Sequence, residues 1–191
     1  EYTSAVGNDA NDGLSPDQPK ASIRAILDTY DLKPGDVVLV DAGLYSLGTN
    51  IFVTAQDSGV TIRGAVEHET RLDRGNKNSG AYVFELQGAD DVSLEHLSIT
   101  GGYGGIQAAN GQDSDHLSLI DSRVWNNNYA ISIDTSNDFF ALSGSVVEYS
   151  NNRGVYVNGA DALIEGNEIA RNSGWGIDIS GSRGRVLNNS V

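Results

Sequence analysis

Short residue patterns recur every 22 to 25 positions along the second half of the chain. The clearest is a glycine or alanine followed by an aliphatic residue, any residue, and a second aliphatic or small residue. Its copies at 105–108, 130–133, 154–157 and 176–179 start 25, 24 and 22 residues apart. Two aliphatic columns keep a similar step: Leu94, Leu119, Leu142, Ile164 and Val186, and Ile99, Val124, Val147, Ile169 and Val191. A chain with this period is expected to fold as a stack of equivalent units.

Each unit holds three short β-type patterns separated by Gly, Asn, Ser or Asp, and none is long enough for a useful helix. A single coil of three strands has no partner for its backbone groups or its apolar face. The coils must therefore stack and pair in parallel, about 4.8 Å apart, as an all-β solenoid. We expect an aliphatic column to fill the interior and a turn column to hydrogen-bond along the stack. The aliphatic column is Ile106, Ile131, Val155 and Ile177, and the turn column is Ser122, Ser145, Asn167 and Asn189.

The first part of the chain follows a different pattern. Ser22 can cap a short helix of about residues 22–30, with an apolar face formed by Ile23, Ile26, Leu27 and Tyr30. We interpret residues 1–36 as a cap over the first coil and residues 37–191 as the coils. The sequence stops in the middle of a coil, so we expect this end to be open or truncated. Self-association through the open end is one way to cover it.

The chain has 26 acidic and 12 basic residues, a net charge of −14. This excess disfavours nucleic acid, and no apolar run approaches the ~18 residues needed to cross a bilayer, so membrane insertion is not expected. There is no cysteine, which excludes a disulfide framework, a thiolate metal site and a cysteine nucleophile. The first residue is Glu1 rather than methionine. We therefore expect a processed, secreted protein or a segment of a longer one.

Several motifs occur in the order typical of one superfamily. These are Gly7-Asn8-Asp9 with Asn11-Asp12-Gly13, the short helix, the segment 33–36 (Lys-Pro-Gly-Asp), the segment 41–45 (Asp-Ala-Gly-Leu-Tyr), and then the repeats. Together they resemble secreted, right-handed parallel β-helix proteins of the pectate-lyase-like superfamily. The resemblance implies a right-handed, single-stranded parallel β-helix of about 22–25 residues per coil with an N-terminal capping helix. It implies a polysaccharide partner, and its members include lyases, mannuronan epimerases, glycoside hydrolases and surface proteins without known chemistry.

A uronate lyase or epimerase needs a base and a group that neutralises the substrate carboxylate. The Asp-Pro-His signature of the epimerases is absent, since the prolines are at positions 16, 19 and 34. The candidate catalytic residues are His96, Asp121, Arg123 and Arg171. His96 is expected one coil below Asp121, where the two form either an acid–base pair or a simple surface contact. The arginines are either functional groups or solvated counter-charges.

A second set of residues is suited to holding sugars. Tyr129, Arg153 and Trp175 precede successive repeat positions and can stack as an aromatic and cation-π platform. Tyr149, Tyr156 and Asp178 are expected beside them, the last two in the polar outward column Glu85, Gln107, Ser132, Tyr156 and Asp178. The alternative is ordinary turn packing with a solvated polar face.

Acidic loops raise the question of calcium, which prefers several carboxylate and carbonyl oxygens. The candidate ligands are Asp9, Asp12, Asp113 and Asp115, and Ca²⁺ is the only cofactor that the sequence suggests. Neither segment has the EF-hand pattern, and Asx turns explain both equally well.

Two hypotheses follow for function. The first is a secreted β-helix module that binds an acidic or neutral polysaccharide and is either a lyase, epimerase or hydrolase or has no activity. The second is a non-catalytic structural or adhesion module of a longer cell-surface protein. A base and a carboxylate-neutralising group in one groove favour an enzyme, whereas further coils or anchoring domains favour the structural module.

Overall fold

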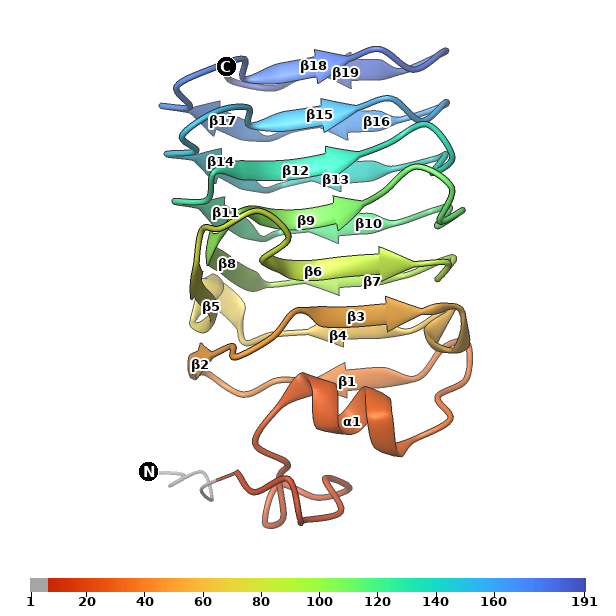
Figure 1. Ribbon diagram of the computed structural model, residues 1–191, viewed down its shortest axis with the longest axis vertical. Helices are drawn as coiled ribbons and strands as arrows, with labels where there is room; N and C mark the ends of the chain where they lie inside the picture. Colours follow the sequence, from red (N-terminus) through yellow and green to blue (C-terminus); the bar gives the residue numbers. More distant parts are fainter. Residues whose placement is uncertain (1–6) are drawn as a thin grey trace.

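The computed structural model describes residues 7–191 and is a stack of parallel β-coils beneath which one short helix lies (Figure 1). Each coil contributes one strand to each of three parallel sheets, which we call sheets A, B and C. The fold class predicted from the repeats, an all-β parallel solenoid with a short N-terminal helix, is confirmed. No helix in the described part is long and apolar enough to cross a membrane.

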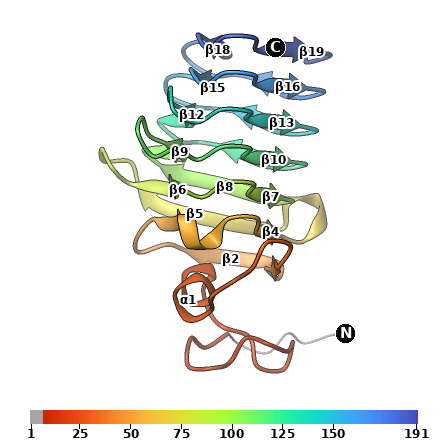
Figure 2. The ribbon, with the colours of Figure 1, turned by 90° about the vertical axis from the view of Figure 1, so that its right-hand side faces the viewer.

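The three sheets are ordered strand by strand along the stack (Figures 1 and 2). Sheet A contains β1 (Val37–Leu39), β4 (Thr61–Arg63), β7 (Ser93–Glu95), β10 (Ser118–Ile120), β13 (Ala141–Ser143), β16 (Leu163–Glu165) and β19 (Arg185–Leu187). Sheet B contains β2 (Gly43–Ser46), β5 (Thr70–Asn76), β8 (Leu97–Gly102), β11 (Arg123–Trp125), β14 (Val146–Glu148) and β17 (Glu168–Ala170). Sheet C contains β3 (Ile51–Thr54), β6 (Tyr82–Gln87), β9 (Gly104–Ala108), β12 (Tyr129–Ile133), β15 (Val155–Val157) and β18 (Ile177–Ile179).

The core is formed by the aliphatic columns that the repeats predict. Leu119 pairs with Leu94 and Leu142, and Val124 pairs with Ile99 and Val147, each in register between neighbouring coils. In sheet C, Ile106, Ile131 and Val155 are fully buried and in register, while Ile177 in the last coil is partly exposed. Burying each of these side chains contributes about 1.5–3 kcal/mol.

The predicted turn column is confirmed as a hydrogen-bond ladder between sheets A and B. The backbone N–H of Leu97 donates to Ser122 Oγ (3.1 Å), that of Ser122 to Ser145 Oγ (3.1 Å), and that of Ser145 to Asn167 Oδ1 (2.8 Å). The N–H of Asn167 continues the ladder to Asn189 Oδ1 (2.9 Å). Each buried turn N–H is thus satisfied by a side chain from the next coil.

Two further ladders were not anticipated from the sequence. Asn127, fully buried between sheets B and C, accepts from the N–H of Gly102 (2.8 Å) and donates to Ile99 O (3.2 Å). Between sheets C and A, Asp90 Oδ1 accepts from the N–H of Asp115 (2.8 Å), and Asp115 Oδ1 accepts from that of Asp138 (2.7 Å). At each of the three corners, side chains therefore form hydrogen bonds with the backbone of a neighbouring coil.

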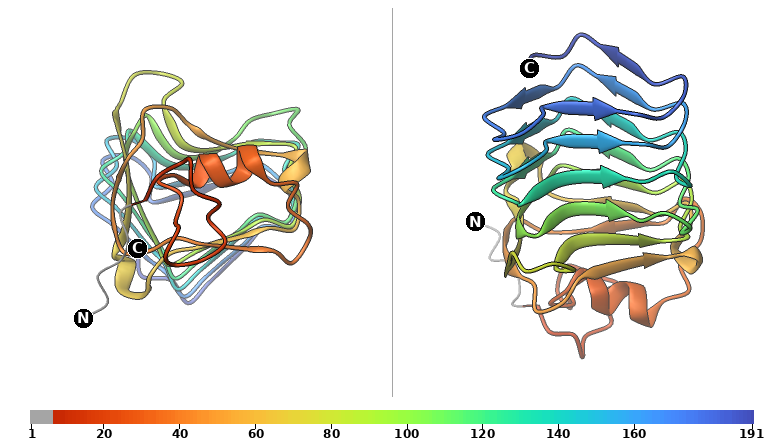
Figure 3. Two further views of the ribbon diagram at one scale, coloured as in Figure 1. Left: turned by 90° about the horizontal axis from the view of Figure 1, so that it is seen from below. Right: turned by 45° about the horizontal axis from the view of Figure 1, so that its top comes forward.

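The helix α1 (Ile23–Thr29) lies across one end of the stack (Figure 3, left). Ser22 Oγ accepts from the N–H of Ala25 (3.1 Å) as the expected N-cap, and Ile23 is buried. The helix covers only part of this end. Beside it lies an open apolar depression of about 1520 Å³ whose lining includes Leu32, Val38 and Leu44. At the other end, self-association through β18 and β19 stays a prediction.

Candidate functional site

The outward face of sheet C carries the polar column that the repeats predict. Glu85, Gln107, Ser132, Tyr156 and Asp178 are paired in register from β6 to β18. Their side chains point outward because the residues on either side of the first four, such as Ile131 and Ile133 around Ser132, are buried in the core, and Asp178 is in register with Tyr156. The column forms a continuous ribbon of hydrogen-bonding groups along the stack.

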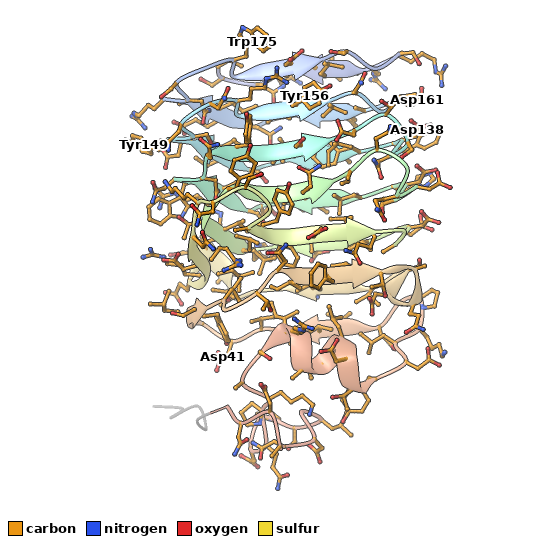
Figure 4. The ribbon with its side chains drawn as sticks, viewed as in Figure 1. Asp41, Asp138, Tyr149, Tyr156, Asp161 and Trp175 are labelled. Carbon is orange, nitrogen blue, oxygen red and sulfur yellow. The ribbon has the colours of Figure 1, made fainter. Side chains whose placement is uncertain are left out.

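An edge of aromatic and guanidinium groups runs beside this column, where the chain enters sheet C. The ring centroids of Tyr82 and Tyr103 are 6.2 Å apart, and those of Tyr103 and Tyr129 are 5.3 Å apart in an edge-on arrangement. Further along the stack, the Arg153 guanidinium lies 4.8 Å from the ring centroids of both Tyr156 and Trp175. We call these six residues the aromatic edge, and Tyr156 belongs both to this edge and to the polar column. Figure 4 shows Tyr156 on β15 and Trp175 in the adjacent coil.

Sequence reasoning found four members of the aromatic edge and missed Tyr82 and Tyr103. Tyr82 is the first residue of β6, and Tyr103 stands immediately before β9. The signal was present for Tyr82, which stands two residues before Phe84 as Tyr129 stands two residues before Ile131, and both tyrosines are in register with Gly104. Burial, followed by the charge of Glu85, the neighbouring Tyr103 and the charge of Asp134, raises the pKa of Tyr82. Its hydroxyl therefore stays protonated and remains a hydrogen-bond donor at neutral pH.

Negative side chains outnumber positive ones on the sheet C face from β6 to β18. Arg153 Nη1 lies 3.7 Å from Asp178 Oδ2, so the guanidinium is partly compensated. Glu85 accepts a hydrogen bond from Asn50 (2.6 Å), and Asp134 lies 3.5 Å from Gln107 Nε2. From β6 to β18, the face therefore has three carboxylates (Glu85, Asp134 and Asp178) and the guanidinium of Arg153, a net charge of 1 − 3 = −2, while Arg24 stacks on Phe52 at the β3 end of the same face. The face offers aromatic surface and many hydrogen-bonding groups with a negative potential.

Tyr149 does not join the aromatic edge. It lies at the end of sheet B, at the edge of the molecule in Figure 4, well away from Tyr156. Its ring packs 5.5 Å from the Arg171 guanidinium instead. The structure therefore brings together five of the six residues proposed from the sequence as sugar-binding and places the sixth next to a different face.

The four candidate catalytic residues fall into two groups. Arg123 and Arg171 converge on one carboxylate, because Arg123 Nη2 donates to Glu148 Oε1 (2.6 Å) and Arg171 Nη1 to Glu148 Oε2 (3.1 Å). The Glu148 side chain is only 8% exposed, which makes it the anchor of both guanidiniums, and sequence reasoning missed it.

His96 and Asp121 do not form a pair. The backbone N–H of His96 donates to Ile120 O (3.2 Å), which places the two residues in neighbouring coils as the repeats predict. The Asp121 carboxylate, however, lies against Gly144 in the coil on its other side. Within residues 7–191, no hydrogen bond or ion pair joins the side chains of His96 and Asp121. The interpretation as an acid–base pair therefore receives no support from this arrangement.

The N-terminal acidic segment already has internal partners. Asp9 Oδ1 accepts from the N–H groups of Ala21 (2.8 Å) and Ser22 (3.0 Å), and Asp12 Oδ1 accepts from that of Leu14 (2.9 Å) in an Asx turn. The Lys20 ammonium donates to the carbonyls of Asp9 (2.9 Å) and Asn11 (2.7 Å). A lysine cation thus occupies the loop carbonyls that a metal ion would need.

The second acidic segment contains Asp113 and Asp115, and these two residues have different surroundings. Asp115 belongs to the ladder between sheets C and A, whereas Asp113 is an exposed residue with a positive φ of 56°. Over residues 7–191, no three or more His, Cys, Asp or Glu side chains are grouped so that they could hold a metal ion. Calcium binding by these residues stays a prediction.

Two solved structures share the fold. The chain is similar to the pectate lyase Pel9A, with a TM-score of 0.62 and 18% identity over 87% of this chain and 52% of that one. It is also similar to the pectin methylesterase from Yersinia enterocolitica, with a TM-score of 0.52 and 14% identity over 84% of this chain and 60% of that one. The chain therefore spans little more than half of either relative, and at these identities the likeness shows the fold alone.

Comparison with family models is more specific. No curated protein matches the chain significantly. One family model, described as "Periplasmic copper-binding protein (NosD)", matches residues 37–191, which is the whole of the described solenoid from the first residue of β1 onward. Because this match covers well over half of the sequence, the chain belongs to the NosD family of parallel β-helix proteins.

Proposed function

We propose that this chain is an extracytoplasmic glycan-binding module that holds a neutral polysaccharide along the sheet C face. The observation that carries the proposal is the aromatic edge beside the polar column. Tyr129, Arg153 and Trp175 lie in successive coils, and the column alongside supplies donors and acceptors for sugar hydroxyls. Aromatic rings pack on the C–H faces of pyranose rings, and flanking polar groups fix their orientation.

The charge of the face supports a neutral rather than an acidic ligand. With a local charge of −2 in a chain of −14, the sheet C face repels a polyuronate. The Arg153 guanidinium is already within 3.7 Å of Asp178, and Arg24 at the β3 end of the face is paired with Asp28. A lyase or epimerase requires a group free to neutralise a uronate carboxylate beside the base. The arrangement therefore favours binding over uronate chemistry on this face.

The extracytoplasmic location is part of the same proposal. The family description names a periplasmic protein, and a chain without cysteine is compatible with an oxidising compartment. The similar solved folds, a pectate lyase and a pectin methylesterase, belong to proteins named for acting on polysaccharides.

The copper in the family description does not fit the residues of this chain. Thiolates and thioethers hold Cu(I), and Cu(II) takes imidazoles together with other N and O donors. The chain has no Cys and no Met, and its three histidines are His68, His96 and His116. Throughout the described segment they are not grouped with one another or with carboxylates as a site of three or more ligands. We therefore assign no role to copper in the function of these residues.

The proposal predicts that Trp175→Ala loses glycan binding while the fold is retained. Trp175 is 57% exposed and stacks on Arg153, so its removal takes away ring surface without opening the core. We expect affinity to fall about tenfold or more, about 1.4 kcal/mol, as for an exposed aromatic anchor at an interface. The melting temperature should change by less than about 2 °C. The measurement is affinity electrophoresis in gels containing hydroxyethyl cellulose, galactomannan or mixed-linkage β-glucan.

The matched control is Tyr149→Ala. Tyr149 is a similarly exposed aromatic residue, at 48%, but lies off the sheet C face. Its replacement should leave migration in every neutral gel unchanged. If none of the neutral gels retards the wild-type protein, or if both variants lose retardation equally, the proposal is wrong and a structural module is favoured.

A further inference from the structure

A second ligand-accessible face lies on sheet B, on the side of the solenoid adjacent to sheet C (Figures 1 and 3). Four of the chain's twelve basic side chains lie on this side, and two of them contact the indole of Trp125. The Arg71 and Arg123 guanidiniums lie 4.9 and 4.6 Å from the Trp125 ring centroid. Arg171 shares Glu148 with Arg123, and Lys77 Nζ donates to Asn126 Oδ1 (2.8 Å). We call Arg71, Lys77, Arg123, Arg171 and Trp125 the basic strip.

The Trp125 indole is fixed before any ligand arrives. Its Nε1 donates to Ser98 Oγ (3.0 Å), one coil closer to the N-terminus. Ser98 stands between Arg71 and Arg123 in the sheet register, so its short side chain leaves room for the indole between the two guanidiniums. A ring held by a hydrogen bond and two cation-π contacts loses little conformational entropy on binding.

Two of the guanidiniums are also held in place by the protein. Arg123 Nε and Nη2 both donate to Glu148 Oε1 (3.0 and 2.6 Å), while Arg171 donates to the other carboxylate oxygen. Each guanidinium has five N–H donors, so most donors of both groups remain available. The Arg123 side chain is 36% exposed and that of Arg171 is 59% exposed.

The strip is positive although the chain is strongly acidic. The face holds its four basic groups and three carboxylates, those of Asp73, Glu148 and Glu168. The net charge of the face is therefore 4 − 3 = +1 in a chain of −14. The arginines also recur in alternate coils. Arg71 is in β5, Arg123 is in β11 and Arg171 follows β17, and these strands are two places apart in sheet B. They are therefore spaced about 10 Å apart along the stack.

We propose that the basic strip binds a linear polysaccharide that carries carboxylate groups, lying along the solenoid axis. Guanidinium N–H groups bind carboxylates through paired, charge-assisted hydrogen bonds, and the indole supplies a surface for a sugar ring. The regular line of cations matches a polymer with regularly spaced charge better than a planar membrane surface does. A chain with a pI near 4.3 lacks the broad basic surface expected for nucleic acid. This site is separate from the neutral-glycan site proposed on sheet C.

The test is affinity electrophoresis in gels containing polygalacturonate or alginate at 20 and 200 mM salt. Wild-type protein should be retarded at low salt and much less at high salt, because exposed charge interactions are screened. Arg171→Gln combined with Lys77→Gln, both at exposed positions, should weaken binding about tenfold. Arg183→Gln combined with Arg185→Gln removes two exposed charges off the strip and should leave binding within about twofold.

A third variant separates a specific loss of binding from the effects of a changed net charge or of misfolding. Arg123→Gln combined with Glu148→Gln leaves the net charge at −14 and does not strand a buried carboxylate. It should lose polygalacturonate binding while keeping neutral-glycan binding on sheet C. In a Trp175→Phe background Trp125 is the only tryptophan, and its fluorescence should change on addition of polygalacturonate.

Three results would overturn the proposal. The first is an absence of retardation of wild-type protein in both acidic gels at low salt. The second is equal binding by the Arg171/Lys77 variant and its charge-matched control. The third is tighter binding to a single-stranded oligonucleotide or to vesicles containing phosphatidylglycerol than to polygalacturonate, which would assign the strip to another class of partner. Failure of Trp175→Ala to affect neutral glycans would leave this proposal untouched, so the two proposals fail separately.

Discussion

Replacing Asn167 with alanine is expected to lower the free energy of unfolding by about 2–4 kcal/mol, because it leaves a buried backbone N–H without its acceptor and removes further buried hydrogen bonds between coils. Asn167 is 3% exposed. Its Oδ1 accepts from the N–H of Ser145 (2.8 Å) and its Nδ2 donates to Leu142 O (3.0 Å), so alanine leaves the Ser145 N–H without this acceptor and removes the side-chain donor to Leu142 O. Asn167 Nδ2 also donates to Asn189 Oδ1 (2.8 Å), which couples this coil to the next.

Urea unfolding followed by far-UV circular dichroism measures this effect. Asn151→Ala is the matched control, since Asn151 is exposed and bonds to the neighbouring coil through its backbone N–H (3.0 Å to Asn127 O). It should change stability by less than about 0.5 kcal/mol. Equal stability of Asn167→Ala and the control would show that the turn ladder does not support the fold.

Gly159→Ala is expected to destabilise the protein by about 3 kcal/mol through steric overlap with the preceding coil. A Cβ at Gly159 would overlap the carbonyl oxygen of Asn137. That carbonyl cannot move aside easily, because the Asn137 side chain accepts from Ser114 N–H (2.9 Å) and donates to the carbonyls of Ala108 (3.2 Å) and Ala109 (3.1 Å). The coils would have to separate locally and lose parallel pairing.

The control for this substitution is Gly48→Ala. Gly48 is exposed, and no heavy atom lies within 4 Å of the position that a Cβ would take. Alanine there should be neutral or should stabilise the protein by up to about 1 kcal/mol through the unfolded state. Thermal melts compare the pair directly. Similar melting temperatures for the two variants would contradict the close approach of coils at Gly159.

The register of the coils could be predicted because equivalent residues repeat in the sequence. Leu94, Leu119 and Leu142 align by spacing alone, and the same alignment places Ser122, Ser145 and Asn167 in one turn. The Asn127 ladder was harder to find, because Asn126, Asn127 and Asn128 are adjacent and only the turn geometry selects the buried one. Composition indicates that such a turn exists but not which amide faces inward.

The positions of the candidate site residues could also be predicted only in part from the sequence. Tyr149 and Tyr129 both follow sheet B and precede or begin sheet C, so spacing alone did not separate them. Tyr149 has a positive φ of 53°, as do its column neighbours Asn126 (53°) and Arg171 (54°), and these three residues directly follow strands of sheet B. Tyr129 lies at the other end of the equivalent turn, as the first residue of β12 in sheet C. Recognising two columns within one turn would have paired Tyr149 with Arg171 from the sequence.

The different charges of the two faces could not be obtained from the net charge. The value of −14 is a sum over the whole chain, in which the sheet C face from β6 to β18 contributes −2 and the sheet B face contributes +1. Glu148 illustrates why, since its role as the anchor of Arg123 and Arg171 depends on side chains that are 23 to 25 residues away in sequence. Only the stacking of coils brings the three together.

The most direct test of a glycan-binding sheet C face uses the two tryptophans as reporters. The indole N–H of Trp175 lies on the aromatic edge and that of Trp125 lies on sheet B, bonded to Ser98 (3.0 Å). The measurement is a ¹H–¹⁵N NMR titration with oligosaccharides prepared from the neutral polysaccharide that best retards the protein. We expect the Trp175 indole signal to shift together with amides of β12, β15 and β18, while the Trp125 signal stays in place. A stationary Trp175 signal, or a shift confined to Trp125, would contradict the assignment of the neutral-glycan site to sheet C.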